Sequence, residues 1–353
     1  MRFTVLPLVL LVLVGCRNDP AGPNNGQNSR PIERGVYVLN EGDFNTPNDA
    51  RLSALDIDRD IVVTDLFESG NAGAHLGTVG DDMKFHNGRA YIVMSRSQNL
   101  VVMNLSTLAK EAEVFFPGSA VHDLLIDSVG NRLFLTRLFS SSVFVLNLST
   151  LTVIDSISVG SNPQGMALAN GKLFVCNSGY GSDKTVSVVS TGTNDVITTL
   201  TVGDGPTQAA LASDGKIWVA CTGNAFATPP TTGSIFMVDP VTNTKVDSLL
   251  FSENLWGTIS IGSDGYAYVL GVTSGNFYGG PVHRISTLTK IIITNFISGT
   301  YYGLAFDNVV REIYVADVKN FSGNGEAKIY TSAGALRKTF AAQKGPAVFC
   351  FKR

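Results

Sequence analysis

Charged residues are scarce in this sequence. Asp, Glu, Lys and Arg make up 16% of the 353 residues, against about 25% in a typical soluble domain. The formal net charge is only −3, and no block of Lys or Arg offers a run of cations to phosphates, which argues against a nucleic-acid partner. Hydrophobic residues reach 44%, which predicts a large core and a surface that relies on Ser, Thr, Asn and Gly.

Cysteine is also rare, and no CxxC or CxxCH motif occurs among the four cysteines. If Cys16 serves as a lipid attachment site, Cys176, Cys221 and Cys350 remain, and their number and spacing are not those of a disulfide framework. Each of the three falls inside a predicted strand, where Cys behaves as a small apolar residue. We therefore expect buried thiols.

Motifs of known catalytic chemistry are missing. The four histidines show neither HExxH nor HxH spacing, and no GxSxG nucleophile elbow occurs. His86 and His283 lie in a predicted turn and a predicted strand, where packing or solvent exposure accounts for them. The sequence thus predicts no catalytic residue; enzymatic activity stays open, and a non-enzymatic role is favoured.

The N-terminus carries an apolar run that is too short to cross a membrane. Arg2 is followed by twelve mostly apolar residues, whereas a span needs roughly 20. The run ends Leu13-Val14-Gly15-Cys16, which resembles a bacterial lipobox, so we expect a signal peptide over 1–15 and a lipid on Cys16. The alternative is an ordinary secretory peptide that ends near a Cys.

Residues 16–34 are rich in Asn, Pro and Gly and have almost nothing to bury. Such a composition predicts a disordered tether between a lipid anchor and a folded body. Arg17, rather than an Asp, follows the lipidated Cys. The resemblance to bacterial lipoproteins with this feature implies an outer-membrane location. Whether the body faces the periplasm or the cell surface stays open.

A short apolar motif with an aromatic residue recurs seven times at intervals of 40 to 54 residues. It suits a strand packed on both faces, and a repeat of this length with only short strands is typical of a propeller blade. The seven motifs are Val36-Tyr37-Val38-Leu39-Asn40, Ala90-Tyr91-Ile92-Val93-Met94, Leu133-Phe134-Leu135-Thr136, Leu173-Phe174-Val175-Cys176-Asn177, Ile217-Trp218-Val219-Ala220-Cys221, Ala267-Tyr268-Val269-Leu270 and Ile313-Tyr314-Val315-Ala316-Asp317.

Each repeat divides into four short strands, with Gly-bearing turns such as Asn87-Gly88 and Asn170-Gly171 between the first and second. The first repeat starts directly with its second strand, and the chain ends with Gly345-Pro346, which matches the start of an inner strand at Gly205-Pro206. We therefore predict an all-β fold over 35–353, a seven-bladed propeller of four-stranded blades. Its C-terminal strand completes the first blade and leaves no open edge.

The motif resembles the YVTN-type, or YncE-like, β-propeller repeat over nearly all of the chain from Gly35 onward. The opening 36–42, the Asn-rich loop after it and the lipobox are similar more narrowly to surface lipoproteins encoded beside TonB-dependent transporters. One branch of these, the BtuG type, captures cobalamin. The resemblance implies a lipid-anchored capture protein with a corrinoid among its candidate ligands, but no residue here identifies corrin recognition.

Inserted residues gather in loops that join second to third strands, at 41–51, 178–184, 222–233, 273–280 and 319–326. Such loops open on one face of a propeller, at the mouth of its channel, so we place the site there. Aromatic and amide side chains in them suit a flat or sugar-like ligand, although the rings could also simply pack on each other. The predicted ligand-binding residues are Glu41, Phe44, Arg96, Arg137, Tyr180, Phe226, Trp256, Phe277, Tyr278, Tyr301 and Phe321, with Tyr302 as a further candidate beside Tyr301.

Charged residues near the predicted channel are few. Asp81, Asp82, His122 and Asp123 head inner strands. They could bind a ligand or a divalent cation, as calcium is bound in lactonase propellers, or they could only fasten one blade to the next. No cofactor and no specific metal ligand are predicted.

Three functions follow. The first is a non-enzymatic envelope lipoprotein whose loop-rich face binds a small molecule, such as a corrinoid or a glycan, or a partner such as a TonB-dependent transporter. The second is a metal-dependent, lactonase-like hydrolase that uses the channel acids. The third is a protein–protein scaffold in the cell envelope.

Overall fold

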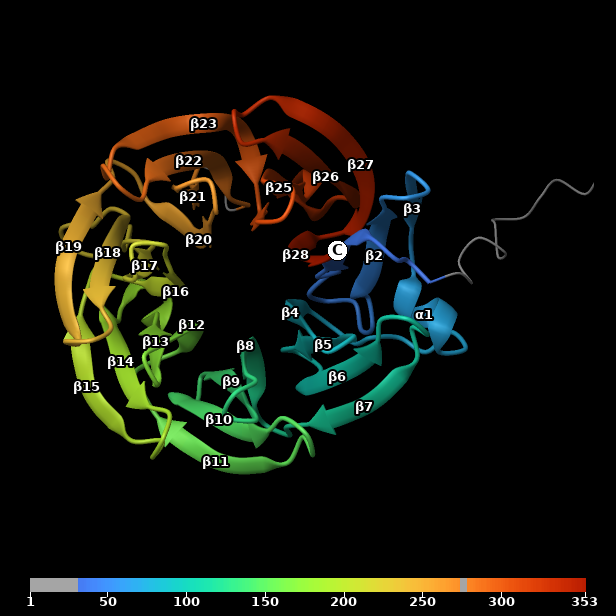
Figure 1. Ribbon diagram of the computed structural model, residues 1–353, viewed down its shortest axis with the longest axis horizontal. Helices are drawn as coiled ribbons and strands as arrows, with labels where there is room; N and C mark the ends of the chain where they lie inside the picture. Colours follow the sequence, from blue (N-terminus) through green and yellow to red (C-terminus); the bar gives the residue numbers. More distant parts are fainter. Residues whose placement is uncertain (1–30, 274–277) are drawn as a thin grey trace, which may run out of the picture. The chain divides into compact units, whose positions relative to one another are not determined.

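Seven four-stranded antiparallel sheets form a ring in the computed structural model (Figure 1). The structure describes residues 31–273 and 278–353, and its folded unit spans Pro31–Arg353. The predicted all-β, seven-bladed propeller is confirmed. The predicted signal peptide, Cys16 and the tether up to residue 30 lie outside the described residues, as does Phe277.

Each sheet is one blade, whose first strand faces the centre of the ring and whose fourth strand lies outside (Figure 1). Blades 1 to 3 consist of β28 (Pro346–Lys352), β1 (Gly35–Asn40), β2 (Arg51–Asp56) and β3 (Ile61–Val63); β4 (Gly80–His86), β5 (Arg89–Met94), β6 (Asn99–Asn104) and β7 (Lys110–Phe115); and β8 (Ala120–Asp127), β9 (Arg132–Leu138), β10 (Ser142–Asn147) and β11 (Val153–Ser158).

The remaining blades repeat this order. Blades 4 and 5 consist of β12 (Pro163–Ala169), β13 (Lys172–Asn177), β14 (Thr185–Ser190) and β15 (Val196–Thr201); and β16 (Pro206–Leu211), β17 (Ile217–Cys221), β18 (Ser234–Asp239) and β19 (Thr244–Leu250). Blades 6 and 7 consist of β20 (Leu255–Ile261), β21 (Tyr266–Gly271), β22 (Gly280–Ser286) and β23 (Ile292–Tyr301); and β24 (Gly303–Asp307), β25 (Glu312–Asp317), β26 (Asn324–Thr331) and β27 (Leu336–Lys344).

The C-terminal strand closes the ring. β28 pairs antiparallel with β1, and Val38 lies opposite Phe349. The first blade is therefore built from both ends of the folded unit, as the match between Gly345-Pro346 and Gly205-Pro206 predicts. Because β28 pairs with β1, β1 has a neighbouring strand on each side. Its backbone donors and acceptors are therefore not left at an open edge.

The aromatic residue of each repeat is buried on a second strand, between its own blade and a neighbour. Tyr37, Phe134, Phe174, Trp218 and Tyr268 are fully inaccessible to solvent. Burying a side chain of this size contributes about 1.5–3 kcal/mol, so the recurrence of the motif at every blade stabilises the whole ring. This explains why the repeat is easiest to detect at these positions.

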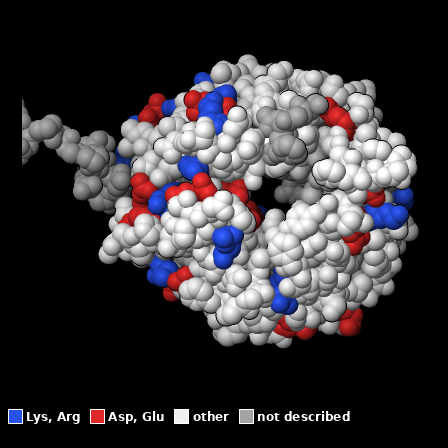
Figure 2. Space-filling view, turned by 180° about the vertical axis from the view of Figure 1, so that it is seen from behind, with Lys and Arg blue, Asp and Glu red and all other residues white. Residues whose placement is uncertain are grey.

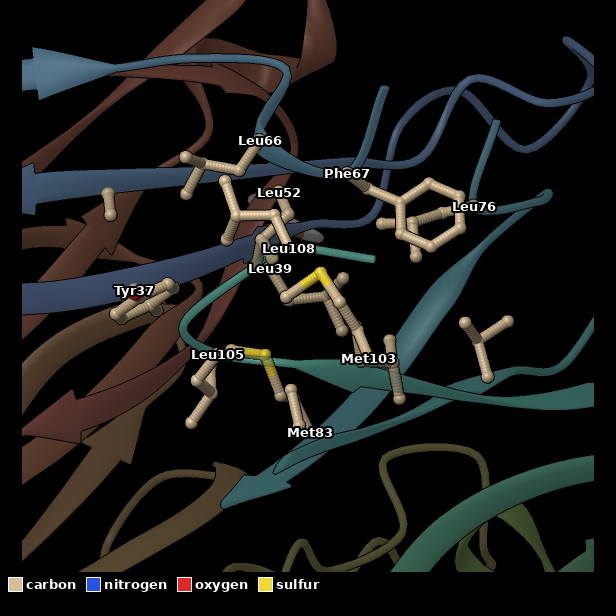
Figure 3. Close-up of a cluster of buried hydrophobic side chains, with 14 of the residues drawn as sticks. Tyr37, Leu39, Leu52, Leu66, Phe67, Leu76, Met83, Met103, Leu105 and Leu108 are labelled. Atoms are coloured by element: carbon tan, nitrogen blue, oxygen red, sulfur yellow. The ribbon is translucent and has the colours of Figure 1, made fainter. Parts of the chain in front are cut away.

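The contact between blades 1 and 2 includes a short helix that the sequence pattern did not predict. Helix α1 (Leu66–Gly70) lies in the connection from β3 to β4 and buries Leu66 and Phe67 against Leu52 and Met103 (Figure 3). At five residues it is too short for apolar periodicity to reveal it. Ile32 joins the same cluster with 1% exposure, so chain packing begins before β1.

The tight turns have the predicted backbone conformation. Asn87 and Gly88, and likewise Asn170 and Gly171, have positive φ angles of 47°, 73°, 49° and 67°. Two successive positive φ angles define the turn that matches strand twist in a two-residue hairpin, and Asn and Gly tolerate them best. Within residues 31–273 and 278–353, no helix has the length and apolar character needed to cross a lipid bilayer.

Candidate functional site

The long loops share one face of the ring. Loops 41–50, 178–184, 222–233 and 318–323, and the described residues 272–273 and 278–279, each connect the second strand of a blade to the third. Seen from the side opposite to Figure 1, the ring is hollowed at its centre, and Asp or Glu atoms lie at the wall of the hollow (Figure 2). Most of the surface around it carries no charge.

Ring closure fixes the first of these loops. The backbone N–H of Glu41 donates to the Gly345 carbonyl at 2.6 Å, and that of Gly42 donates to the Lys344 carbonyl at 3.0 Å. Lys344 Nζ also pairs with Asp43 Oδ2 at 2.7 Å. Gly345 has a φ of +69°, and a Cβ there would lie 2.7 Å from the ring of Phe321. The segment that closes the ring therefore also positions the loop-face side chains.

Five aromatic rings border a cavity of about 310 Å³ at the channel mouth. Trp256 lies 5.3 Å from Tyr302, Tyr302 lies 5.3 Å from Phe321, and Phe321 lies 5.6 Å from Tyr278 between ring centroids. The rings thus support one another and still leave open volume. The lining residues of this aromatic pocket are Glu41, Gly42, Asp43, Phe44, Trp256, Tyr278, Tyr302 and Phe321.

Glu41 lies where the aromatic pocket meets the channel. Its Oε2 accepts a hydrogen bond of 2.7 Å from the Tyr302 hydroxyl. Burial, together with the nearby Asp81 carboxylate, raises the pKa of Glu41 to about 7, against the lowering effect of that hydrogen bond. No Lys, Arg or His of the described residues forms an ion pair with it. Near neutral pH this carboxyl is therefore divided between its protonated and ionised forms.

Below the mouth, inner strands of all seven blades enclose a channel cavity of about 420 Å³. Its ionisable lining residues are Glu41, Asp81, Asp82, Lys84, His122 and Asp123. Burial raises the pKa of Asp81 to about 7, although the Ser95 N–H donates to its Oδ2 at 2.9 Å. His122 Nε2 lies 3.9 Å from Asp81 Oδ1, and burial lowers the pKa of His122, which favours a neutral ring.

Asp82 and Asp123 fasten adjacent blades. Asp82 Oδ2 accepts the Leu124 N–H at 3.0 Å, and Asp123 Oδ2 accepts the Met166 N–H at 3.1 Å. Both donors belong to inner strands whose pairing register shifts just before them, so the bulges free these N–H groups from the strand ladder. Lys84 Nζ lies 2.5 and 2.6 Å from the two oxygens of Asp82. These contacts are structural.

The same contact recurs elsewhere with uncharged side chains. Gln208 Oε1 accepts the Ile259 N–H at 2.7 Å, and Ser260 Oγ accepts the Phe306 N–H at 2.9 Å.

Burial and the neighbouring Asp82 raise the pKa of Asp123 well above its ordinary value. Within the described ranges, no three His, Cys, Asp or Glu side chains converge closely enough to bind a metal ion.

The predicted ligand-binding residues fall into two groups. Glu41, Phe44, Trp256, Tyr278 and Phe321 meet in the aromatic pocket, which joins blades 1, 6 and 7. Arg96 stands beside it, with its guanidinium carbon 4.3 Å from the centroid of the Phe44 ring.

Three other predicted residues within the described ranges, Arg137, Tyr180 and Phe226, do not line the pocket. Arg137 stacks on Phe144 at 4.1 Å and donates to the hydroxyls of Ser119 and Ser142. Tyr180 packs on Phe139 at 5.8 Å, and Phe226 is 93% exposed in its own loop.

Adjacent tyrosines divide between the core and the pocket. Tyr301 is 3% exposed and its hydroxyl lies 2.9 Å from that of Tyr330, within the cluster that joins blades 6 and 7. Tyr302 instead turns toward Glu41 and Trp256. The sequence predicts Tyr301 as a site residue and Tyr302 as a further candidate. Choosing between the two tyrosines requires knowing where β23 ends and β24 begins. The alternation of residues along a strand does not reveal that point.

Similar solved structures share the propeller fold. A quinonprotein alcohol dehydrogenase-like protein from Bacteroides thetaiotaomicron VPI-5482 aligns with a TM-score of 0.68 at 14% identity, covering 91% of this chain and 79% of that chain. A functionally unknown protein from Desulfotomaculum acetoxidans DSM 771 aligns with a TM-score of 0.67 at 14% identity, covering 90% and 98%. Hydrazine synthase from Kuenenia stuttgartiensis aligns with a TM-score of 0.59 at 18% identity, covering 69% and 74%.

Identities this low establish a shared fold and leave function to the site itself. A search of curated proteins finds no match to the sequence. The family model described as "Domain of unknown function (DUF5074)" matches residues 34–351, and the chain therefore belongs to this family of propellers.

Proposed function

We propose that this protein is a non-enzymatic binding protein that takes a small molecule in the aromatic pocket at the mouth of its channel. The observation that carries the proposal is the pocket itself, where five rings and the carboxyl of Glu41 surround about 310 Å³. Sites for small ligands are typically concave and mostly apolar, with a few convergent polar groups. Perturbed titration of Glu41 at the same place adds support, because such groups cluster at functional sites.

We also propose that the protein works in the cell envelope. A lipid on Cys16 and the tether of 16–34 would hold the propeller at a membrane, at the outer membrane by its resemblance to lipoproteins of this kind. The narrower YncE-like and BtuG-type likeness makes a corrinoid, a glycan or a TonB-dependent transporter candidate partners. A ligand larger than the pocket would extend over the surrounding loops.

The hydrolytic alternative has less support. Two of the four residues named for it, Asp82 and Asp123, already accept hydrogen bonds from neighbouring blades. Metal analysis of the purified protein, combined with esterase and lactonase assays, tests this alternative. A bound divalent metal together with turnover would favour it over simple binding.

Calorimetric titration with corrinoids, oligosaccharides and a metabolite panel tests the proposed function. We expect one ligand to bind with unit stoichiometry, and Trp256→Ala or Tyr278→Ala to weaken it at least tenfold. Phe226→Ala is the matched control, since it removes an exposed aromatic of the same face outside the pocket. Equal loss in all three variants, or no loss in the pocket variants, would contradict the proposal.

A further inference from the structure

The lining of the aromatic pocket is biased toward one sign of charge. Its described residues are five aromatic side chains together with Glu41, Gly42 and Asp43. None of them is Lys, Arg or His. Asp43 has a counter-charge, because Lys344 Nζ lies 2.7 Å from its carboxylate. Glu41 has only the hydroxyl of Tyr302. The pocket therefore presents one uncompensated carboxyl among five aromatic rings.

Ring faces carry negative electrostatic potential and attract a cation within about 6 Å, most strongly for Trp. Trp256, Tyr302 and Phe321 form a continuous series of contacting rings beside Glu41. Phe44 already has the guanidinium of Arg96 on its ring at 4.3 Å, so we expect it to contribute less than the other four. An anionic ligand would meet repulsion from ionised Glu41, and a neutral ligand would leave Glu41 favouring its protonated form, whereas a cation supplies the counter-charge that its carboxylate lacks.

We infer that the aromatic pocket selects an organic cation, such as a quaternary ammonium or a protonated amine on an apolar body, with the rings contacting the cation and Glu41 neutralising it. This inference rests on the proposed function and names the class of its ligand. The cation would occupy the end of the pocket nearest the channel, where Glu41 and Tyr302 meet Trp256.

Titration behaviour at the mouth supports this assignment. The groups that face Glu41 are the Tyr302 hydroxyl and the Asp81 carboxyl. Farther away lie His122, Asp123 and the Asp82–Lys84 pair in the channel, and the Asp43–Lys344 pair and Arg96 at the pocket. Burial raises the pKa of both Glu41 and Asp81 to about 7. A cation bound beside them favours their ionised forms, so binding should release protons near neutral pH and affinity should rise from pH 5.5 to pH 8.

An isosteric pair of probes tests the charge directly. Choline and 3,3-dimethylbutan-1-ol have nearly the same shape, but only choline carries a charge, and benzyltrimethylammonium adds an aromatic body. We expect both cations to bind at least tenfold more tightly than the neutral alcohol, with proton release in calorimetry repeated in buffers of different ionisation enthalpy. Equal binding of the charged and neutral probes, or no binding of either cation, would overturn the inference.

Variants separate the role of Glu41 from a loss of folding. Glu41→Gln keeps the size and the acceptor for Tyr302, so we expect it to weaken choline at least tenfold, to abolish proton release from this group and to leave the neutral alcohol unchanged. Phe226→Ala should change none of these values. Unaltered choline binding in Glu41→Gln would contradict the inference, and circular dichroism of each variant confirms that it is folded.

These experiments distinguish a failure of the cation inference from a failure of the proposed binding function. If a neutral or anionic compound of the metabolite panel binds and depends on Trp256, the proposed function stands and the cation inference falls. If neither the panel nor the two cations bind, both fall.

Discussion

Replacing Glu41 by Gln should stabilise the protein at alkaline pH. The pKa of Glu41 rises from its ordinary 4.5 to about 7 in the folded state, so the folded state binds this proton more tightly than the unfolded chain. The stability gained from that proton is complete at low pH and is lost as pH rises from 4.5 through 7. Above pH 7 the folded protein contains a buried, ionised carboxylate, which is unfavourable. Glu41→Gln removes this unfavourable free energy.

The size of the effect follows from the shift. The rise in the Glu41 pKa from 4.5 to about 7 corresponds to at most about 3 kcal/mol in the free energy of unfolding. Because the carboxyl is partly open to the channel, we expect about 1–2 kcal/mol. With a urea dependence of about 3 kcal/mol per molar, the midpoint at pH 8 should rise by about 0.5 M. At pH 5, where Glu41 is protonated in the folded state, the variant and the parent should unfold at nearly the same urea concentration.

Urea unfolding followed by circular dichroism at pH 5 and pH 8 provides the measurement. Glu33→Gln is a matched control, since it makes the same chemical change at an exposed position of the same N-terminal region. Asp81 titrates in both proteins, and because its carboxylate helps to raise the pKa of Glu41, Glu41→Gln should also ease the ionisation of Asp81 and so add to the stabilisation at pH 8. An equal loss of stability at both pH values, or an unchanged midpoint at pH 8, would refute the described burial of Glu41.

Three further predictions concern the ring. Phe349→Ala in the closing strand removes a ring that lies 6.0 Å from Tyr314, and should cost about 3–5 kcal/mol in urea unfolding; a change below 1 kcal/mol would argue against closure by β28. Asp82→Ala leaves the buried Leu124 N–H without its acceptor and the partly exposed Lys84 ammonium without its carboxylate and should cost about 1–3 kcal/mol, whereas Asp82→Asn keeps an acceptor and should cost less. Cys176 and Cys221 are buried and should resist a thiol reagent until the protein unfolds; rapid labelling at either would contradict their placement.

Much of the ring could be predicted from sequence because its determinants are local. The aromatic of each second strand, the Asn170-Gly171 turn and the Gly345-Pro346 match all lie in short segments whose residue types dictate backbone conformation or burial. Seven copies of one motif also fix the number of blades, since each copy needs neighbours to bury its faces. The long loops could be assigned to one face for the same reason, as strand order decides their side.

The site was only partly predictable because it depends on contacts between blades. Phe44, Trp256, Tyr278 and Phe321 come from three blades, and nothing in the local pattern states that they meet while Tyr180 and Phe226 lie elsewhere. The choice between Tyr301 and Tyr302 depends on where one strand ends. The fastening role of Asp82 depends on a bulge in the next blade, which its own segment does not encode.

Fluorescence of Trp256 tests the central claim most directly. The chain has two tryptophans; Trp218 is fully buried in the ring and Trp256 lines the aromatic pocket. Titration with a ligand found by calorimetry should change the emission saturably, with the same affinity, and Trp256→Phe should abolish that change while Phe226→Ala preserves it. Tight binding with no change in Trp256 emission, and with undiminished affinity in Trp256→Phe, would show that the ligand binds outside the pocket.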